Sequence, residues 1–297
     1  MTLADTYAQI SPSLVAFGTR LGVAPSKEKP AFPKLFGTGF VVDGRGIVLT
    51  NRHVIDALIN LPKGCAMAVV FPHQEHIAGE THQPVLFRGV RSYHLLEAFE
   101  ADGPFYGQVL PDMGFVTIDV CGLRPLTISD TPNLIRVGTS VATAGFAMGT
   151  TPFTMLDKIT QLTPILRHGV ISSVFPFPCP HPHGFTIDVV TQGGESGSPI
   201  FLPDTGEVVG LLHAGLPDVL EGTVRNPDST LSAVKILANS NITLALPGHV
   251  LKRGVEQALA ASEPDISAVS ALEDLLKNSE RSPDLRWEPV PLIDHQV

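Results

Sequence analysis

Short apolar segments bounded by glycine, proline, asparagine or aspartate recur along most of the chain. Their length and their content of valine, isoleucine, threonine and phenylalanine are typical of β-strands. Because these segments follow one another without alternating helices, they favour an antiparallel barrel or sandwich. The pattern predicts strands over 14–19, 39–42, 47–50, 66–71, 85–90 and 113–120, and a second set over 137–145, 168–174, 186–191, 198–202, 207–212, 230–236 and 242–245.

Apolar positions at helical spacing occur near the two ends of the chain. A short helix is predicted over 3–10, and Pro247 and Gly248 end the strand pattern before a helix over 249–261. Asp265 is the expected N-cap of a further helix over 266–278, whose apolar stripe predicts packing against the barrel or, as the alternative, a homo-oligomer contact. The stripe consists of Ile266, Val269, Leu272, Leu275 and Leu276.

Composition and charge exclude several classes of function. The 27 glycines and 26 prolines argue against a helical bundle, and the net charge of −9 argues against a nucleic-acid partner. No apolar run reaches the roughly 20 residues that a membrane span requires. Asp5 precedes every lysine and arginine, so no basic leader is expected.

Cysteine usage bears on the compartment. The chain has three cysteines, Cys65, Cys121 and Cys179, at spacings that suggest no disulfide framework. Thiols of this kind are usual where the environment is reducing, so a cytoplasmic location is expected.

A glycine-rich turn at 193–199, with the sequence Gly-Gly-Glu-Ser-Gly-Ser-Pro, carries the strongest chemical signal. Glycines on both sides of Ser196 allow backbone N–H groups to converge on one point, which is what an oxyanion hole requires. An ordinary glycine turn before a strand is the alternative.

A serine nucleophile needs a base, usually a histidine oriented by a carboxylate. His53 follows the predicted hairpin of 39–50 and lies at a strand end, and Asp112 precedes an apolar strand. Asp102, in the preceding polar loop, is the second choice of acid. Asp119 lies at the far end of the same strand, roughly 23 Å from Asp112, and cannot substitute for it.

Together and in this order, these segments resemble the trypsin-like serine peptidases, most closely their Deg/HtrA branch. The resemblance covers about residues 5–255. It rests on Ser-Pro-Ser-Leu-Val at 11–15, Gly-Thr-Gly-Phe at 37–40, Thr-Asn-Arg-His-Val at 50–54, Asp-Met-Gly-Phe-Val at 112–116, the turn at 193–199, and segments at 136–138, 144–146, 169–172 and 245–247.

The resemblance implies an all-β, chymotrypsin-like fold of two perpendicular, six-stranded antiparallel barrels. The first, residues 1–125, would carry the histidine and aspartate, and the second, 126–248, the serine; helices and a tail would occupy 249–297. It also implies a serine endopeptidase that hydrolyses polypeptides through an acyl-enzyme, without a cofactor.

Site roles follow from the same resemblance. His53 would be the general base and acid, Asp112 would orient it, and Ser196 would attack the scissile carbonyl. The N–H groups of Gly194 and Ser196 would form the oxyanion hole.

The chain departs from the Deg/HtrA pattern in three ways, one of which is a His-rich polar loop with His73, His76 and His82 between His53 and Asp112. Ser198 stands where that branch has glycine, although Gly-x-Ser-Gly-Ser-Pro is also similar to the bacterial glutamyl endopeptidases. Residues 262–297 are too few for a PDZ domain.

No charged side chain is expected at the bottom of the specificity pocket. Val190, six residues before Ser196, takes the place of the acid that selects lysine and arginine in trypsin. His213 is displaced by one position from the acid-selecting histidine of glutamyl endopeptidases, and neighbouring side chains on a strand point to opposite faces. A small or apolar P1 residue is therefore expected. The pocket residues would be Val190, Thr191, Leu212, His213, Ala214 and Gly215.

Other interpretations stay open at this point. The same fold could serve as a silent scaffold that binds extended peptides by strand addition, or as an esterase. Two groups of metal-ligand residues, Cys179 with His181 and His183, and His73 with His76 and His82, each lack a clear fourth ligand, so no metal site is expected.

Overall fold

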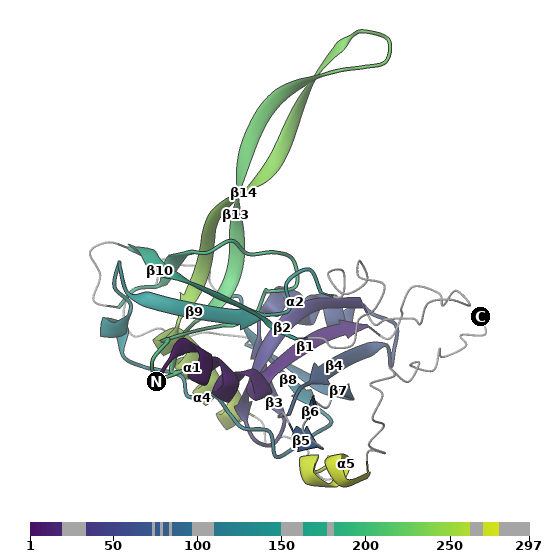
Figure 1. Ribbon diagram of the computed structural model, residues 1–297, viewed down its shortest axis with the longest axis vertical. Helices are drawn as coiled ribbons and strands as arrows, with labels where there is room; N and C mark the ends of the chain where they lie inside the picture. Colours follow the sequence, from purple (N-terminus) through teal and green to yellow (C-terminus); the bar gives the residue numbers. More distant parts are fainter. Residues whose placement is uncertain are drawn as a thin grey trace, which may run out of the picture.

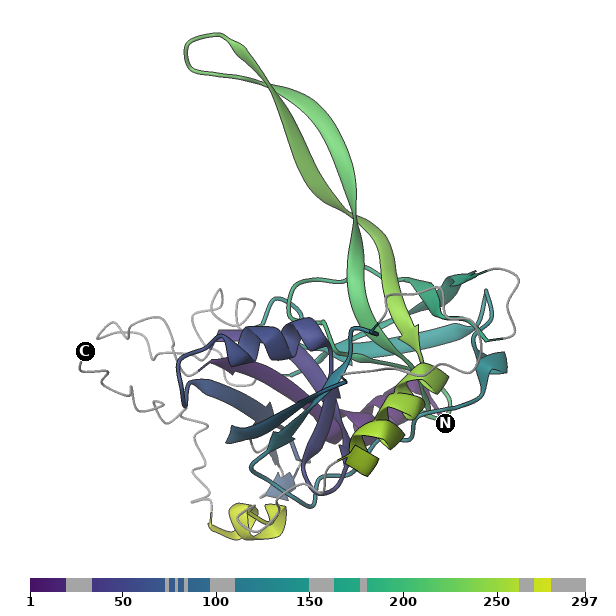
Figure 2. The same cartoon turned by 180° about the vertical axis from the view of Figure 1, so that it is seen from behind.

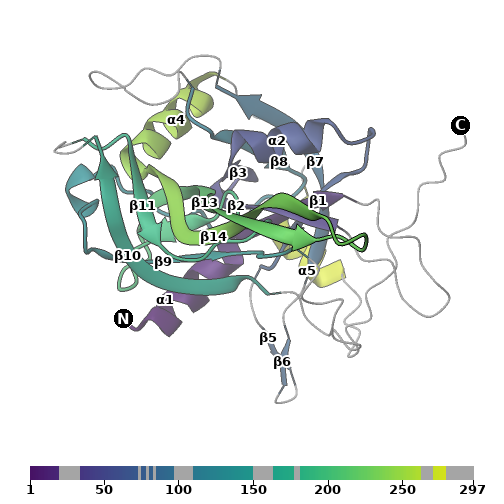
Figure 3. The ribbon, with the colours of Figure 1, turned by 90° about the horizontal axis from the view of Figure 1, so that it is seen from above.

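A computed structural model describes residues 1–19, 34–72, 75–77, 80–82, 85–96, 110–149, 163–176, 181–261 and 270–278. Two closed barrels of six antiparallel strands lie side by side (Figures 1 and 3). The expectation of an all-β double barrel is confirmed.

The first barrel has the strand order β1-β2-β3-β8-β7-β4. Its strands are β1 Leu14–Thr19, β2 Lys34–Asp43, β3 Ile47–Thr50, β4 Ala66–Val70, β7 Leu86–Leu95 and β8 Gly114–Ile118. The second barrel has the order β10-β11-β14-β13-β12-β9. It is formed by β9 Ser140–Gly145, β10 Ile165–Phe175, β11 Gly184–Asp188, β12 Pro199–Phe201, β13 Val208–Arg225 and β14 Leu231–Pro247.

Strand β1 of the first barrel is buried on both faces. On β1, Val15 and Phe17 belong to one core cluster, whereas Leu14 and Ala16 belong to another. This second cluster also contains residues of the second barrel, and the rings of Phe71 and Phe146 stack across it at 5.1 Å. The alternating side chains of a strand thus fill the first barrel and attach it to the second.

The helices join the barrels to one another. α1 Leu3–Ile10 precedes the first barrel but lies on the second, where Tyr7 donates its hydroxyl to Pro164 O at 2.7 Å. α4 Gly248–Ala261 follows the second barrel (Figure 2). Its Val250 and Leu251 are buried in the core cluster that both barrels share. The predicted helices over 3–10 and 249–261 are confirmed.

α5 Leu272–Asn278 lies on the first barrel. Leu272 and Leu275 pack against its core, and Leu272 N donates to Cys121 O at 2.9 Å. For these two residues the prediction of packing against the barrel is confirmed. Ile266 and Val269 lie outside the described residues.

Two parts of the prediction were wrong. The segments 230–236 and 242–245 belong to one strand, β14, and the strand predicted over 207–212 continues to Arg225. The two long strands pair from Gly210↔Pro247 to Arg225↔Leu231 and form an arm that projects from the body (Figure 1). The helix α2 Arg52–Ile59 was also missed.

The remaining elements are short. They are η1 Ser11–Ser13, η2 Pro132–Leu134, and the small hairpin of β5 Glu75–Ile77 and β6 Glu80–His82. No helix in the described ranges is both long and apolar enough to cross a membrane.

Candidate active site

His53 lies in the first turn of α2, directly after strand β3. Its Nδ1 is 2.6 Å from Asp112 Oδ2, and its backbone N–H donates to Asp112 Oδ1 at 3.0 Å. The side chain is 49% exposed, so the ring is held on one edge and open on the other. An imidazole in this setting can take up a proton from a group in the cleft.

Asp112 precedes β8 and is held in place through its backbone as well as its carboxylate. Asn51, the N-cap of α2, is fully buried and donates its side-chain Nδ2 to Asp112 O at 2.8 Å. Burial alone would raise the pKa of Asp112, but hydrogen bonds from His213 and His53 outweigh it and hold that pKa well below its usual range. Asp112 is therefore an ionised acceptor at neutral pH.

A second imidazole contacts the same carboxylate. His213 Nδ1 lies 2.7 Å from Asp112 Oδ2, the oxygen that also bonds His53. The sequence placed His213 in the wall of the specificity pocket, whereas the structure directs its ring toward the first barrel. The strand register skips it between Leu212 and Ala214, which is the mark of a β-bulge.

The loop that carries Ser196 has a backbone that only glycine tolerates at two positions. Gly194 has φ +97° and Gly197 has φ +88°, and a Cβ on Gly197 would lie 2.0 Å from Thr38 O. Gly197 N donates to Leu212 O at 3.1 Å, and Ser198 Oγ donates to Glu195 O at 2.6 Å. These bonds fix the turn around Ser196, which is partly exposed.

The Ser196 hydroxyl makes no direct hydrogen bond to His53, although both residues lie in described parts of the chain. Such bonds are often long in a substrate-free site and shorten when substrate binds. Asp112 and His53 are thus in direct contact. The loop that carries Ser196 is joined through Gly197 N and Leu212 O to β13, the strand that also carries His213.

Thr38, on β2 of the first barrel, forms hydrogen bonds to the loop of the second barrel that carries Ser196. Its backbone N–H donates to Ser196 O at 2.8 Å and its hydroxyl donates to Gly194 O at 2.7 Å. The same hydroxyl accepts from Phe146 N at 3.0 Å. The carbonyls of Gly194 and Ser196 therefore point toward Thr38, and in the described structure neither residue's N–H donates to a protein acceptor.

Glu195 lies between these two N–H groups and is 1% exposed. Its carboxylate bonds Arg167 Nε at 2.7 Å and accepts from Gln192 N at 2.6 Å. Burial raises the pKa of Glu195, and Arg167 opposes that shift. The ion pair connects the loop to β10, which carries Arg167.

Comparison with known proteins decides the family. The description "Trypsin-like peptidase domain" matches residues 37–211, which include His53, Asp112 and Ser196. The chain belongs to the trypsin-like peptidases. It is a serine endopeptidase. A search of curated proteins found no match.

Solved structures agree with the fold of this trypsin-like peptidase. An HtrA-type protease, AlgW with a decapeptide, is 14% identical with a TM-score of 0.54, covering 88% of this chain and 68% of its own. A serine endoprotease from Yersinia pestis is 15% identical with a TM-score of 0.52, covering 88% and 67%. The expected likeness to the Deg/HtrA branch is confirmed.

The residues predicted from sequence to line the specificity pocket lie on β13 and in the segment that follows β11. Thr191 is 7% exposed, and its hydroxyl bonds that of Thr243 at 2.8 Å. Leu212 is 2% exposed and belongs to the second-barrel core, whereas Gly215 is exposed and a Cβ there would lie 3.1 Å from Thr191 Oγ1. Val190 and Ala214 are partly buried.

The cluster of His53, Asp112 and His213 is also the peptidase's candidate for metal binding within the described residues, since one ligand atom of each lies within 4.8 Å of the others. The separations of 2.6 and 2.7 Å from Asp112 Oδ2 are hydrogen-bond lengths. Ligand atoms on one tetrahedral zinc ion lie about 3.3 Å apart, so the shorter observed separations are those of hydrogen bonds.

The metal-ligand groups considered from sequence lie partly outside the described residues. Cys179 and His73 lie outside the described residues, as do the side chains of His76 and His82. His181 is described, and its ring meets that of His249 edge-on at 6.1 Å. Asp102, the second choice of acid, also lies outside the described ranges.

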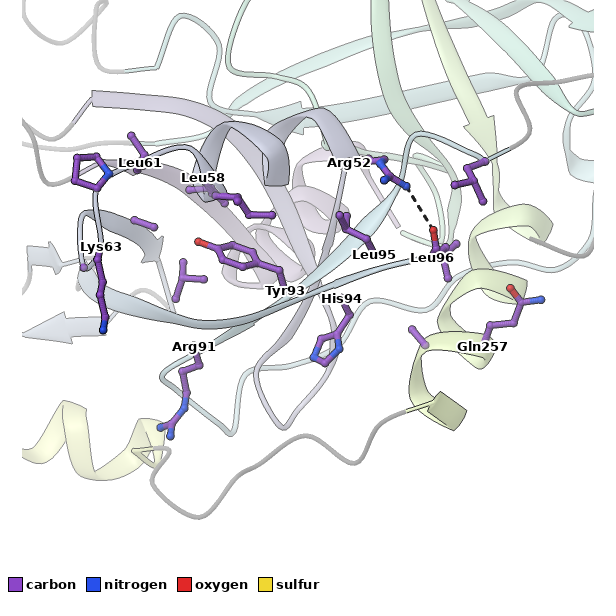
Figure 4. A pocket seen from close by; sticks show the side chains of 17 residues that line it. Arg52, Leu58, Leu61, Lys63, Arg91, Tyr93, His94, Leu95, Leu96 and Gln257 are labelled. Atoms are coloured by element: carbon purple, nitrogen blue, oxygen red, sulfur yellow. Dashed lines mark hydrogen bonds between the residues drawn. The ribbon is translucent and has the colours of Figure 1, made fainter. Parts of the chain in front are cut away.

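A groove of the peptidase is lined by none of His53, Asp112 and Ser196 (Figure 4). Leu58 of α2, and Tyr93 and Leu95 of β7, line it on the first barrel, and Gln257 of α4 lines it as well. Leu96 and Leu110, which flank the undescribed segment 97–109, also belong to the lining, so we assign no site to it.

Proposed function

We propose that His53, Asp112 and Ser196 act together as the catalytic triad of this serine endopeptidase. The observation that carries the proposal is the 2.6 Å contact between His53 Nδ1 and Asp112 Oδ2, on a ring whose other edge is open. An ionised carboxylate only accepts hydrogen bonds, so His53 Nδ1 carries a proton and Nε2 is left as the base.

The steps follow the chemistry of the superfamily. Ser196 Oγ attacks the scissile carbonyl while His53 Nε2 takes its proton, and the imidazolium returns that proton to the leaving amine. The N–H groups of Gly194 and Ser196 stabilise the oxyanion, because neither is used by another described group of the protein. Water then hydrolyses the acyl-enzyme, with His53 again as the base.

We propose a preference for small or apolar P1 residues. Among Val190, Thr191, Leu212, His213, Ala214 and Gly215 the one ionisable side chain is His213, and its ring bonds Asp112. The hydroxyl of Thr191 is already used by Thr243. A charged P1 side chain would find no counter-charge among these residues.

The division of the chain into 1–125, 126–248 and 249–297 is likewise a proposal, as is a cytoplasmic location. The odd number of cysteines, at spacings that suggest no disulfide framework, supports the proposed location. Fluorescence of a tagged full-length chain, with an organelle marker as reference, tests the location.

We also propose that the chain self-associates.

Fluorophosphonate labelling tests the triad. One adduct is expected on the wild type by intact mass, and none on Ser196→Ala or His53→Ala; Ser232→Ala, on the arm, is the control that keeps the adduct. Absence of labelling on folded wild type would contradict the proposal and favour the peptide-binding scaffold. Cleavage of a chromogenic ester without cleavage of casein would favour an esterase instead.

A further inference from the structure

The ring of His213 is directed by an irregularity in the sheet. Residues Leu212 and Ala214 pair with the consecutive positions Ala245 and Leu244, so His213 is the extra residue of a bulge on β13. A bulge re-aims one side chain without breaking the strand. Here the ring reaches across from the second barrel to Asp112 on the first.

The two rings must be in the same tautomer. Asp112 Oδ2 accepts from Nδ1 of both His53 and His213, and an ionised carboxylate has no proton to donate. Both Nδ1 atoms are therefore protonated by assignment from the hydrogen-bond network, and each neutral ring keeps Nε2 as its basic position. Two bases thus depend on one negative charge.

We propose that His213 is a positioning residue that shares Asp112 with His53, so that the two imidazoles and the carboxylate bind protons as one coupled unit. The inference rests on the proposed triad. When His213 takes up a second proton and becomes cationic, it balances the single negative charge of Asp112. Less of that charge then remains to stabilise the imidazolium that forms on His53 during attack. Two like charges with ligand atoms within 4.8 Å of one another also repel.

Charged groups on the neighbouring elements do not replace this coupling. The residues of β14 and β12 beside the bulge, Ala245, Leu244 and Ile200 among them, are uncharged. In the nucleophile loop, Glu195 is paired with Arg167. On α4, Lys252 is paired with Asp130 at 2.6 Å. His53 and Asp112 are thus the ionisable partners that hydrogen-bond geometry links to His213 among the described residues.

The test compares wild type with His213→Asn and His213→Ala. Asparagine can place a neutral N–H near the position of the histidine Nδ1 but cannot titrate, whereas alanine removes the donor. His168→Asn is the matched control, because His168 is an exposed histidine that bonds Ser140 instead. Thermal unfolding of each variant first establishes that it is folded.

Side-chain ¹⁵N NMR gives a readout that does not require activity. In wild type and in His168→Asn, the His53 signals are expected to titrate in two steps, and in His213→Asn in one step. A single step in wild type, identical to that of His213→Asn, would overturn the inference.

Kinetics give a second readout. The acid limb of log kcat/KM against pH is expected to steepen from a slope of one toward two in wild type and to stay at one in His213→Asn. At neutral pH, His213→Ala should lose about tenfold in kcat/KM, through loss of a hydrogen bond to a charged group. A wild type that shows the two-step titration of His53 but has no peptidase activity would instead count against the proposed triad.

A different observation, the arm, carries a second inference. Residues 217–225 pair with 231–239 beyond the edge of the second barrel, and the views from front and back show the arm standing clear of the body (Figures 1 and 2). Most large aliphatic side chains on the arm and at its base are at least 37% exposed, Val234 being the partly buried exception. The exposed ones are Leu216, Val219, Leu220, Val224, Leu231, Ile236, Leu237 and Ile242.

The register distributes these side chains over both faces of the arm. Leu220 pairs with Ile236 on one face, and Val219 pairs with Leu237 on the other. A two-stranded ribbon with no layer against it is marginally stable in water. An apolar partner packed against the arm would therefore stabilise it.

We infer that this partner is a second copy of the chain, which is present wherever the chain folds. Nine residues in each strand give a ribbon about 30 Å long and about 10 Å wide, or roughly 600 Å² over its two faces. A stable interface buries about 800 Å² on each partner, so the arm alone supplies most of what a symmetric dimer requires.

Light scattering after size exclusion tests the arm. Wild type is expected at twice the chain mass of 31.6 kDa or a higher multiple, and Ile236→Glu should weaken association at least tenfold. Thr223→Glu, a polar position on the arm, is the control that stays associated. Replacing 218–238 by a two-residue turn should give a monomer with both barrels intact. A monomeric wild type, including one that binds polypeptide along the arm, or an oligomer that survives loss of the arm, would overturn the inference.

Discussion

Arg167 and Glu195 form an ion pair at 2.7 Å, and Glu195 is the residue between the two whose N–H groups we assign to the oxyanion hole. Glu195 is 1% exposed and Arg167 is its charged partner. Because the buried carboxylate lies between Gly194 and Ser196 in the chain, whatever moves it also moves both donors.

Arg167→Met should therefore lower kcat at least about tenfold, through displacement of oxyanion donors, and should destabilise the fold by about 3 kcal/mol. With the arginine gone, the pKa of Glu195, already raised by burial, rises further. A raised carboxyl pKa costs stability above that pKa, so the variant should recover stability as pH falls from 7 to 5. Urea unfolding at both pH values measures this. Arg167→Lys is the control, and equal loss in both variants would contradict the role of the charge.

Thr38→Val should uncouple the nucleophile loop from the first barrel. The substitution removes the donor to Gly194 O and the acceptor for Phe146 N, leaving two buried polar groups unsatisfied at roughly 1 to 3 kcal/mol each. We expect a drop in unfolding free energy and about a tenfold loss in kcat. Thr38→Ser keeps the hydroxyl and should retain both, and a serine variant as impaired as the valine variant would point to packing instead.

Asp112→Asn should change how stability depends on pH. The pKa of Asp112 is depressed in the folded state, so its charge contributes stability above the unfolded pKa, and that contribution fades as pH falls toward the folded pKa. The variant should lose roughly 3 kcal/mol at pH 7, and its deficit relative to wild type should shrink below about pH 4. Chemical unfolding across this range tests it; a deficit that is constant with pH would show that the charge is not responsible.

Gly215→Val should narrow the proposed pocket. A Cβ at this position would lie 3.1 Å from Thr191 Oγ1, so the added methyl groups would occupy space beside the P1 side chain. Cleavage after leucine or phenylalanine should fall at least about tenfold relative to cleavage after alanine, since pocket contacts of this size are worth 1–3 kcal/mol. Profiling with a peptide library measures the ratio, with Gly222→Val on the arm as the control. An unchanged ratio would place P1 elsewhere.

Sequence patterns predicted the elements whose local signals agree with their tertiary environment. β1 and β3 were predicted to the residue because both are short, apolar runs bounded by turns. The motif order likewise predicted that His53 and Asp112 meet, and their hydrogen bond bears this out. These features depend on neighbours along the chain or on a shared family pattern.

The features that were missed depend on contacts between barrels or on an unusual strand. α2 was read as a strand end, although Asn51 in the N-cap position followed by Val54, Ile55 and Leu58 on one face was a helix signal. The arm was broken into two strands at 237–241, because alternation there is irregular on a ribbon without an inner face. The position of His213 depends on a one-residue bulge, which reverses the direction of a side chain without leaving a mark in composition.

The bracing by Thr38 has a consequence for protein synthesis. Residue 38 leaves the ribosome long before residues 194 and 196, and the turn around Ser196 also needs the carbonyl of Leu212. A chain that ends before Leu212 contains Thr38 and Ser196 but lacks the carbonyl to which Gly197 N donates. The turn around Ser196 is therefore complete only in a chain that includes strands of both barrels.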